Sequence, residues 1–221
     1  MQDIFLKTKK SDDNDEKGYS PLTPEINFDE DKGEFYLFGD IDAFMAKQFA
    51  YFLLRCCGNK IPDVVIYISS MGGSAVHAMS MVEMMRLCKT TGMRLTTCAM
   101  GGCASGAADV FLHGDIRLIG NYCFFLVHEV SIATEGTNVN NLADEIKSWK
   151  ILTTDLMKET LSGTNIDYEF YLKHAKDRDW IISPADAVKY GLAHNFISTQ
   201  KEVKNGRRKG TEKSSTRRKA S

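Results

Sequence analysis

The stretch that decides the fold reads Val64-Val65-Ile66-Tyr67-Ile68-Ser69-Ser70-Met71-Gly72-Gly73-Ser74. Its first half is rich in β-branched and aromatic residues, which predicts a buried strand. Its second half predicts a tight turn and then a helix, with Ser74 as the N-cap. Two glycines at such a turn let the backbone approach a ligand and point N–H groups outward. A Gly-Gly pair by itself is more often a plain turn, so its meaning depends on the neighbouring motifs.

Strands and helices alternate on both sides of this stretch. The residue patterns predict strands at Glu34–Phe38, Val64–Ile68, Leu95–Ala99, Asp115–Ile119 and Cys123–His128, and helices at Phe44–Cys57, Ser74–Lys89, from Ser105, at Asn138–Leu161 and at Asp167–Ala175. Repeated strand–helix units with right-handed crossovers indicate an α/β fold. The helix at Asn138–Leu161 is long enough to project from a globular body.

Ser105, His128 and Asp179 are a candidate nucleophile, base and orienting acid. Ser105 lies among small residues at a predicted strand-to-helix junction, His128 ends an apolar run, and Asp179 precedes Trp180-Ile181-Ile182. A serine hydroxyl needs a base within hydrogen-bond reach and a third group that fixes the tautomer of that base. The order Ser, His, Asp differs from that of α/β-hydrolases, chymotrypsin and subtilisin. The Gly-x-Ser-x-Gly elbow is also absent, because position 103 is Cys.

Three other acids compete for the orienting role. Asp109 and Asp115 lie near Ser105 in the sequence, and Asp177 is two positions from Asp179. The local pattern alone leaves the choice among them open.

Together these motifs resemble the proteolytic subunit of the Clp protease, the ClpP family. The resemblance spans roughly Glu34 to Ser198, and its blocks occur in the family's order and spacing. They are Ile68-Ser69-Ser70-Met71-Gly72-Gly73, Gly101-Gly102-Cys103-Ala104-Ser105, Val127-His128-Glu129-Val130, Asp179, and Ala187-Val188-Lys189-Tyr190-Gly191-Leu192. The resemblance implies an α/β fold of the crotonase/ClpP-like type, with repeated ββα units and the long helix as a projecting handle.

The resemblance assigns a role to each candidate residue. It makes Ser105 the nucleophile, His128 the base and Asp179 the orienting acid. The backbone N–H groups of Gly73 and Gly106 would form the oxyanion hole, which stabilises the charge that develops on the carbonyl oxygen.

Substrate would bind in an extended form, as an added strand. The segments beside it would include Gly72 and Ser74 on one side and Glu129 and Val130 on the other. If the strand before Glu129 continues, alternation points this side chain to the face opposite His128.

The implied function is a serine endopeptidase that hydrolyses unfolded polypeptides inside two stacked seven-membered rings. Tyr67 and Leu87 align with positions that help form the family's docking pockets for an AAA+ ATPase unfoldase. The ATPase would be a separate protein, because this chain has no Gly-x-x-x-x-Gly-Lys-Ser/Thr phosphate loop. The resemblance implies no metal and no organic cofactor.

The chain departs from the family at three positions. Met71 stands where the family usually has Pro, Gly106 where Met is common, and Val130 where Pro follows the catalytic His. Met71 and Val130 leave the backbone freer than Pro would. Loop geometry and substrate preference are therefore not carried over from the family.

Composition favours one soluble domain. The chain has 221 residues with 43% hydrophobic content, enough for one substantial core. No apolar run approaches the roughly 18 residues of a membrane helix, and the first residues lack the apolar core of a signal peptide. The six cysteines include no C-x-x-C pair, which favours reduced thiols and a cytoplasmic location.

The ends of the chain differ from its middle. We expect a flexible N-terminal arm at 1–26, a ClpP-like serine protease domain at 27–200 and a basic disordered tail at 201–221. The tail has nine Lys/Arg and two Glu, a balance of +7 that leaves −8 on the other residues. Such a tail can bind nucleic acid or another anionic partner, although a simple solvated end is the plainer interpretation.

Three alternative functions stay open at this stage. One is a Clp-like protease for virus head maturation, which the basic tail would fit. A second is a crotonase-like acyl-CoA enzyme, which shares the fold and the oxyanion hole but needs no Ser-His-Asp set. A third is a catalytically inactive ring subunit.

Overall fold

The computed structural model describes residues 27–130 and 138–197. The predicted N-terminal arm and the predicted basic tail lie outside these ranges. The elements are β1 (Phe28–Asp29), β2 (Glu34–Phe38), α1 (Ala43–Gly58), β3 (Asp63–Ser70), α2 (Ala75–Lys89), β4 (Arg94–Ala104), α3 (Gly106–Leu112), β5 (Ile116–Ile119), β6 (Phe124–Val127), α4 (Val139–Leu161), α5 (Tyr168–Ala175), β7 (Trp180–Ile182), α6 (Pro184–Lys189) and β8 (Asn195–Phe196). The α/β class predicted from the sequence is confirmed.

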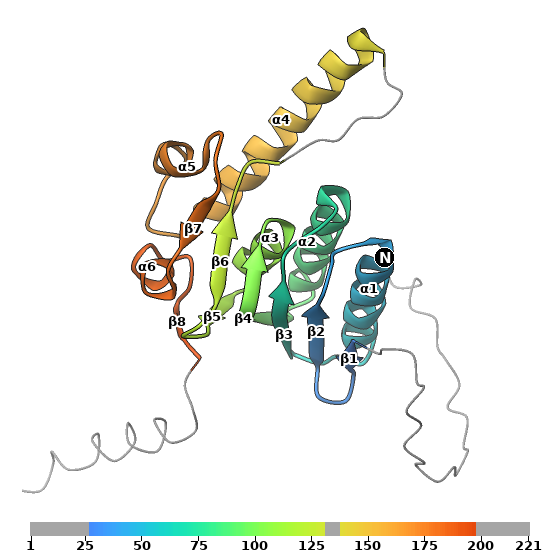
Figure 1. Ribbon diagram of the computed structural model, residues 1–221. Coiled ribbons are helices and arrows are strands. Elements are labelled where there is room, and N and C mark those ends of the chain that lie inside the picture. Colours follow the sequence, from blue (N-terminus) through green and yellow to red (C-terminus); the bar gives the residue numbers. More distant parts are fainter. Residues whose placement is uncertain (1–26, 131–137, 198–221) are drawn as a thin grey trace, which may run out of the picture.

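One largely parallel sheet organises the molecule. Its main path runs β1-β2-β3-β4-β5-β8, while β6 pairs with β4 and β7. The pairs β1–β2 and β6–β7 are antiparallel. Two strands precede a helix at β1-β2-α1 and at β5-β6-α4, a single strand precedes α2, α3 and α6, and α5 follows α4 directly. Figure 1 shows α1, α2 and α3 side by side on one face of the sheet.

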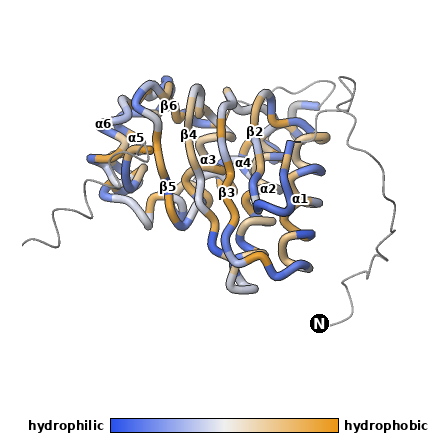
Figure 2. Tube along the Cα trace, turned by 90° about the horizontal axis from the view of Figure 1, so that it is seen from below, coloured by the Kyte–Doolittle hydropathy of each residue, from blue (hydrophilic) through white to orange (hydrophobic). Residues whose placement is uncertain are grey.

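Strand alternation explains why those helices lie on one face. Val64, Ile66 and Ile68 on β3 are fully buried, whereas Tyr67 between them points to the other face and is only half-buried. The buried face packs against apolar residues of α1, such as Phe49, whose ring lies edge-on 4.9 Å from that of Phe35. Figure 2 shows hydrophobic residues concentrated along the strands, including β3 and β5.

Strand β4 is longer than the sequence indicates. A strand was expected only to Ala99, but it continues to Ala104. The register against β3 shifts between Ile68 and Ser70, and beyond the shift Gly102 to Ala104 pair with β6. This extension carries the chain directly to Ser105.

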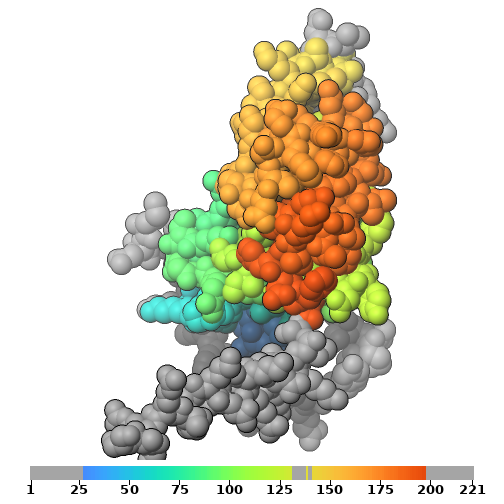
Figure 3. Space-filling view, turned by 90° about the vertical axis from the view of Figure 1, so that its left-hand side faces the viewer, coloured from blue at the N-terminus to red at the C-terminus, as the bar shows by residue number. Residues whose placement is uncertain are grey.

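Helix α4 projects from the globular body, as the sequence predicts (Figures 1 and 3). Its C-terminal end is anchored, since Met157 and Leu161 are buried. Farther toward its N-terminus, Ile151 and Leu152 are 54% and 55% exposed. Within the residues that the structure describes, no helix is long and apolar enough to cross a membrane.

Four helices begin at a capping side chain, whereas the predicted cap at Ser74 is only partly confirmed. Asp42, Asn138, Asp167 and Ser183 each accept a hydrogen bond from a backbone N–H in the first turn of their helices. Ser74 occupies the N-cap position of α2, as predicted, but its hydroxyl makes no capping hydrogen bond. This serine is therefore a weaker helix start than the sequence suggests.

Arg117 on β5 is a buried cation that the sequence did not indicate. Its guanidinium donates hydrogen bonds to four backbone carbonyls, those of Gly114, Gly163, Gly191 and Leu192. Its side chain and backbone are only 6% exposed. These bonds join the sheet to the turn after α4 and to the turn after α6, so one side chain fixes three distant segments.

We predict that Arg117→Ala lowers the free energy of unfolding by about 3 kcal/mol, because several buried carbonyls lose their donor. Arg94→Ala is the matched control, since Arg94 pairs with Asp63 at 2.6 Å on an exposed surface. This control is expected to cost less than about 1 kcal/mol. Urea unfolding followed by circular dichroism measures both, and equal losses would contradict the assigned role of Arg117.

Candidate active site

Ser105 lies at the junction of β4 and α3, in a strained backbone conformation. Its φ of 53° and ψ of −129° are unusual for a residue with a side chain. The Ser105 N–H donates to the carbonyl of Leu126 on β6 at 3.1 Å. The sharp turn places the hydroxyl beside the end of β6.

His128 immediately follows β6, and its ring reaches the serine. The Nε2 atom of His128 lies 2.7 Å from the Oγ of Ser105, a hydrogen bond in which the hydroxyl donates when Nε2 is unprotonated. The pairing of Ala104 with Leu126 sets this approach, because it aligns the ends of β4 and β6.

Asp179 reaches the other ring nitrogen. Strand β7 pairs antiparallel with β6, with Val127 opposite Trp180, so the next pair outward is His128 and Asp179. The Oδ1 atom of Asp179 lies 3.3 Å from the Nδ1 of His128, and the Asp179 side chain is 62% exposed. This contact favours the tautomer that carries its proton on Nδ1 and leaves Nε2 free to accept from Ser105.

The other candidate acids are placed elsewhere. Asp115 forms an ion pair with Lys89 at 2.8 Å and accepts from the N–H of Leu95. Asp177 has a positive φ of 58°, and its N–H donates to Glu129. Asp109 lies one turn into α3 and lines a pocket beside His128. Of the four acids, Asp179 is the one that the structure pairs with the imidazole.

Gly72 packs directly against the serine turn. It has a φ of 96°, and a Cβ there would lie 2.8 Å from the Cβ of Ser105 and 3.1 Å from the N of Gly106. Only glycine fits this contact without displacing the serine.

Gly73 and Gly106 belong to the two segments that meet where Gly72 packs on Ser105. Gly73 forms a bridge with Ile41, in which the N–H of Ser74 donates to the Ile41 carbonyl at 2.9 Å. Gly106 is the first residue of α3, and the first N–H groups of a helix have no intrahelical acceptor. A Cβ at Gly106 would lie 2.7 Å from the Cβ of Ala78, so this chain leaves no space for the family's common Met without rearrangement.

A pocket of about 300 Å³ opens beside His128. Its lining includes Glu129 and Val130, two of the predicted substrate-binding residues, and comes mainly from four helices, α2 to α5, and the segment after β6. The condition for Glu129 to point to the face opposite His128 is not met, because β6 ends at Val127 and strand alternation does not continue. A second hollow of about 370 Å³ runs along α4, but no member of the Ser105–His128–Asp179 set lines it.

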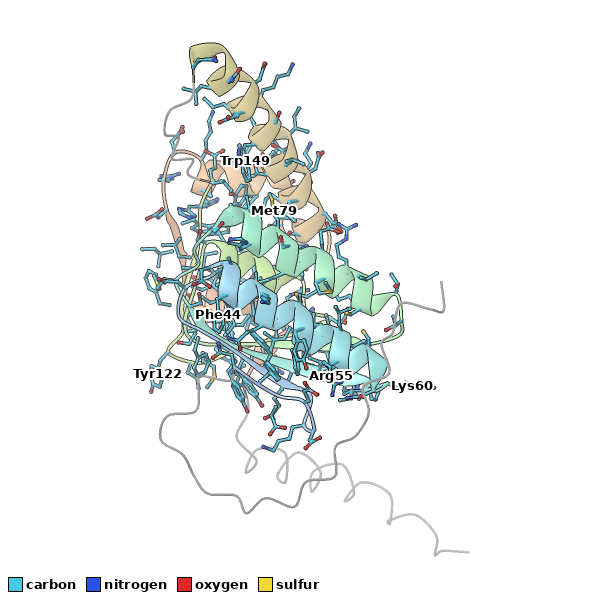
Figure 4. The ribbon with its side chains drawn as sticks, turned by 90° about the vertical axis from the view of Figure 1, so that its right-hand side faces the viewer. Phe44, Arg55, Lys60, Met79, Tyr122 and Trp149 are labelled. Carbon is cyan, nitrogen blue, oxygen red and sulfur yellow. The ribbon has the colours of Figure 1, made fainter. Side chains whose placement is uncertain are left out.

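Met79 and Trp149 form part of the pocket wall and come from different layers. Met79 lies on α2 and Trp149 on the projecting helix α4, and Figure 4 shows the two close together. The long helix therefore contributes to the pocket as well as projecting from the body.

The predicted docking residues, Tyr67 and Leu87, lie on different layers. Tyr67 is on the helix-free face of the sheet, stacked on Tyr36 with ring centroids 5.6 Å apart. Leu87 is on α2, and 54% of it is exposed. In the ranges 27–130 and 138–197, no group of three or more His, Cys, Asp or Glu residues is arranged to hold a metal ion.

Comparison with known proteins agrees with this geometry. The family model described as Clp protease matches residues 30–200. The chain is 27% identical over 139 residues to a protein of Borreliella afzelii named ATP-dependent Clp protease proteolytic subunit, covering 61% of this chain and 67% of that protein. It is 30% identical over 146 residues to the proteolytic subunit 1 of Prochlorococcus marinus, covering 64% of this chain and 71% of that protein.

A third relative extends the match over more of the chain. The proteolytic subunit 3 of the ATP-dependent Clp protease of Rhizobium etli is 25% identical over 174 residues, which cover 76% of this chain and 85% of that protein. The family model spans most of the chain, including the serine junction, the histidine after β6 and the acid before β7. The chain therefore belongs to the Clp protease family.

Proposed function

We propose that this chain is a serine-type endopeptidase in which Ser105 is the nucleophile, His128 the general base and Asp179 the orienting acid. The observation that carries the proposal is the 2.7 Å contact between the Oγ of Ser105 and the Nε2 of His128. Asp179 occupies the opposite nitrogen of the same ring. This arrangement is what a hydroxyl needs to become a nucleophile near neutral pH.

The reaction proceeds in two halves. The Oγ of Ser105 attacks the peptide carbonyl carbon while Nε2 of His128 accepts the hydroxyl proton. When the C–N bond breaks, His128 gives that proton to the leaving amine, and an acyl ester remains on Ser105. Water then attacks the ester with His128 as base, and the proton returns to the Oγ of Ser105 as the C–O bond breaks.

Two backbone N–H groups would stabilise the tetrahedral intermediate. Gly106 directly follows Ser105, and Gly73 directly follows Gly72, which packs closely on Ser105 and on the N of Gly106. Since these groups act through the backbone, the loss of the family's common side chain at 106 leaves the donor in place. Losing one such donor typically costs about 10²–10³ in kcat.

The substrate and the assembly follow from family membership. Unfolded polypeptide would enter a chamber formed by two stacked seven-membered rings, fed by a separate AAA+ ATPase in the cytoplasm. The names of the relatives include the term ATP-dependent, and the exposed apolar residues of α4 offer a surface for contact between copies. The protease domain would be residues 27–200, with the arm at 1–26 and the tail at 201–221 outside it.

We predict that Ser105→Ala and Ser105→Gly both abolish peptidase activity but differ in stability. Alanine keeps the strain of the positive φ, whereas glycine adopts this conformation without it. Ser105→Gly is therefore expected to be more stable than Ser105→Ala by about 1 kcal/mol in chemical denaturation. A fluorophosphonate probe with peptide mapping should label Ser105 in the unmodified protein. Labelling of another serine, or activity in either variant, would exclude Ser105 as the nucleophile.

We predict that Asp179→Asn lowers kcat by about 10³–10⁴-fold, because the amide no longer favours the Nδ1–H tautomer of His128. Asp177→Asn is the matched control, an exposed acid two residues away that does not contact the imidazole. Its kcat should stay within about threefold of the unmodified protein. Steady-state kinetics on one fluorogenic peptide compares the two, and a reversal of the two effects would refute the assignment of Asp179.

We predict that Ile151→Glu on α4 dissociates the assembly, because a charge would be buried where two copies meet. Lys147→Glu is the control, since it changes the charge of the same helix without removing an apolar side chain. Light scattering of the intact protein should give a mass many times that of the 24.8 kDa chain, and Ile151→Glu should lower it. A fully active monomer of the unmodified protein would contradict the chambered assembly.

A further inference from the structure

Asp109 is the one acid of the pocket that lies on the same helix as the nucleophile turn. Its N–H donates to the carbonyl of Ser105 at 3.2 Å, which places Asp109 in the first turn of the helix that follows the serine. Asp109 lines the pocket together with His128. Asp109 therefore belongs to the same pocket as the base that contacts Ser105.

The carboxyl group of Asp109 has no partner in the described part of the chain. No hydrogen bond or ion pair reaches it there, whereas Asp179 contacts His128 and Asp115 contacts Lys89. The other residues of α3 are buried, and burial raises the pKa of Asp109 to about 7. An acid without a partner in such surroundings destabilises the fold, so a structural role does not account for it.

Asp109 is the acid of the pocket whose charge no neighbouring cation in the described residues balances. The other charged lining residues are exposed and balance one another: Glu129 and Asp177 against Lys150 and Lys176. Much of the remaining wall is apolar or aromatic, with Met79, Trp149 and the buried Tyr171. An apolar wall that leads to one carboxylate suits a long aliphatic side chain with a cationic end.

We propose that Asp109 gives this peptidase a preference for cleavage after lysine or arginine, by binding the cationic end of the residue on the acyl side of the scissile bond. The inference rests on the proposed function, because it names the substrate class of the same site. The side chain of that residue would enter the 300 Å³ pocket beside His128. Its ammonium or guanidinium would form with Asp109 the ion pair that the carboxyl group lacks.

The test compares fluorogenic peptides that differ only in the residue before the scissile bond: arginine, lysine, leucine, phenylalanine, glutamine and glutamate. At pH 8 we expect kcat/KM to be on the order of tenfold or more higher for arginine and lysine than for leucine. Asp109→Asn should remove this advantage and leave cleavage after leucine within about threefold. Glu83→Gln, which removes an exposed carboxyl outside this pocket, should leave the ratio unchanged.

Stability supplies a readout that is independent of peptide cleavage. The pKa of Asp109 is raised above its ordinary value of 3.8, so the penalty of ionising it is absent below about pH 4 and complete above about pH 7. Asp109→Asn should therefore raise the melting temperature more at pH 8 than at pH 5. Glu83→Gln, an exposed carboxyl outside the pocket, is the control. The other titratable or charged groups that face the site are His128, Glu129, Lys150, Tyr168, Tyr171, Lys176 and Asp177.

A measurement on the unmodified protein keeps the test valid if Asp109→Asn does not fold. Peptidyl chloromethyl ketones with arginine or leucine at the reacting position alkylate an active-site histidine, and the arginine reagent should react with His128 on the order of tenfold faster. Equal rates, or a faster reaction with the leucine reagent, would overturn the role of Asp109. In that case, labelling of Ser105 by a fluorophosphonate would still support the proposed peptidase. If Ser105 is not labelled and no peptide is cleaved, the proposed function fails, and this inference fails with it.

Discussion

The site depends on a single backbone constraint, the positive φ of Ser105. A residue with a side chain reaches φ 53° and ψ −129° at a cost of about 1–3 kcal/mol. Two contacts hold it there: the hydrogen bond from its N–H to Leu126, and Gly72, which packs so closely that any Cβ would strike Ser105. The turn directs the hydroxyl away from the buried helix α3 and toward the end of β6, where His128 begins.

Strand pairing converts this local turn into a three-residue site. The pairing of β4 with β6 brings His128 to the serine, and the antiparallel pairing of β6 with β7 brings Asp179 to His128. Because side chains alternate along a strand, a slip of one residue in either pair would turn one of these side chains to the other face. Arg117 acts in another part of the sheet, since it holds the carbonyls of Gly191 and Leu192, just before β8, close to β5.

The sequence reveals those parts of the fold that depend on local pattern. The strand through Ile68 and the helix after Gly73 follow from apolar alternation and turn residues, and the triad candidates follow from their positions at element ends. The continuation of β4 through Gly101 and Gly102 is not visible in this way, because glycine pairs usually signal a turn. Its cause is pairing with a strand more than twenty residues later. The role of Arg117 is hidden for the same reason, since its four acceptors come from distant segments.

Two carboxyl groups near His128 illustrate how environment separates roles for the same residue type. Asp179 is 62% exposed, so water and the imidazole together stabilise its charge, and it remains available to orient His128. Asp109 is only partly exposed and has no partner in the described residues, so its charged form is costly until a cation enters the pocket. A substrate with such a cation would recover that lost stability. The ion pair between the substrate side chain and Asp109 would then position the scissile carbonyl for attack by Ser105.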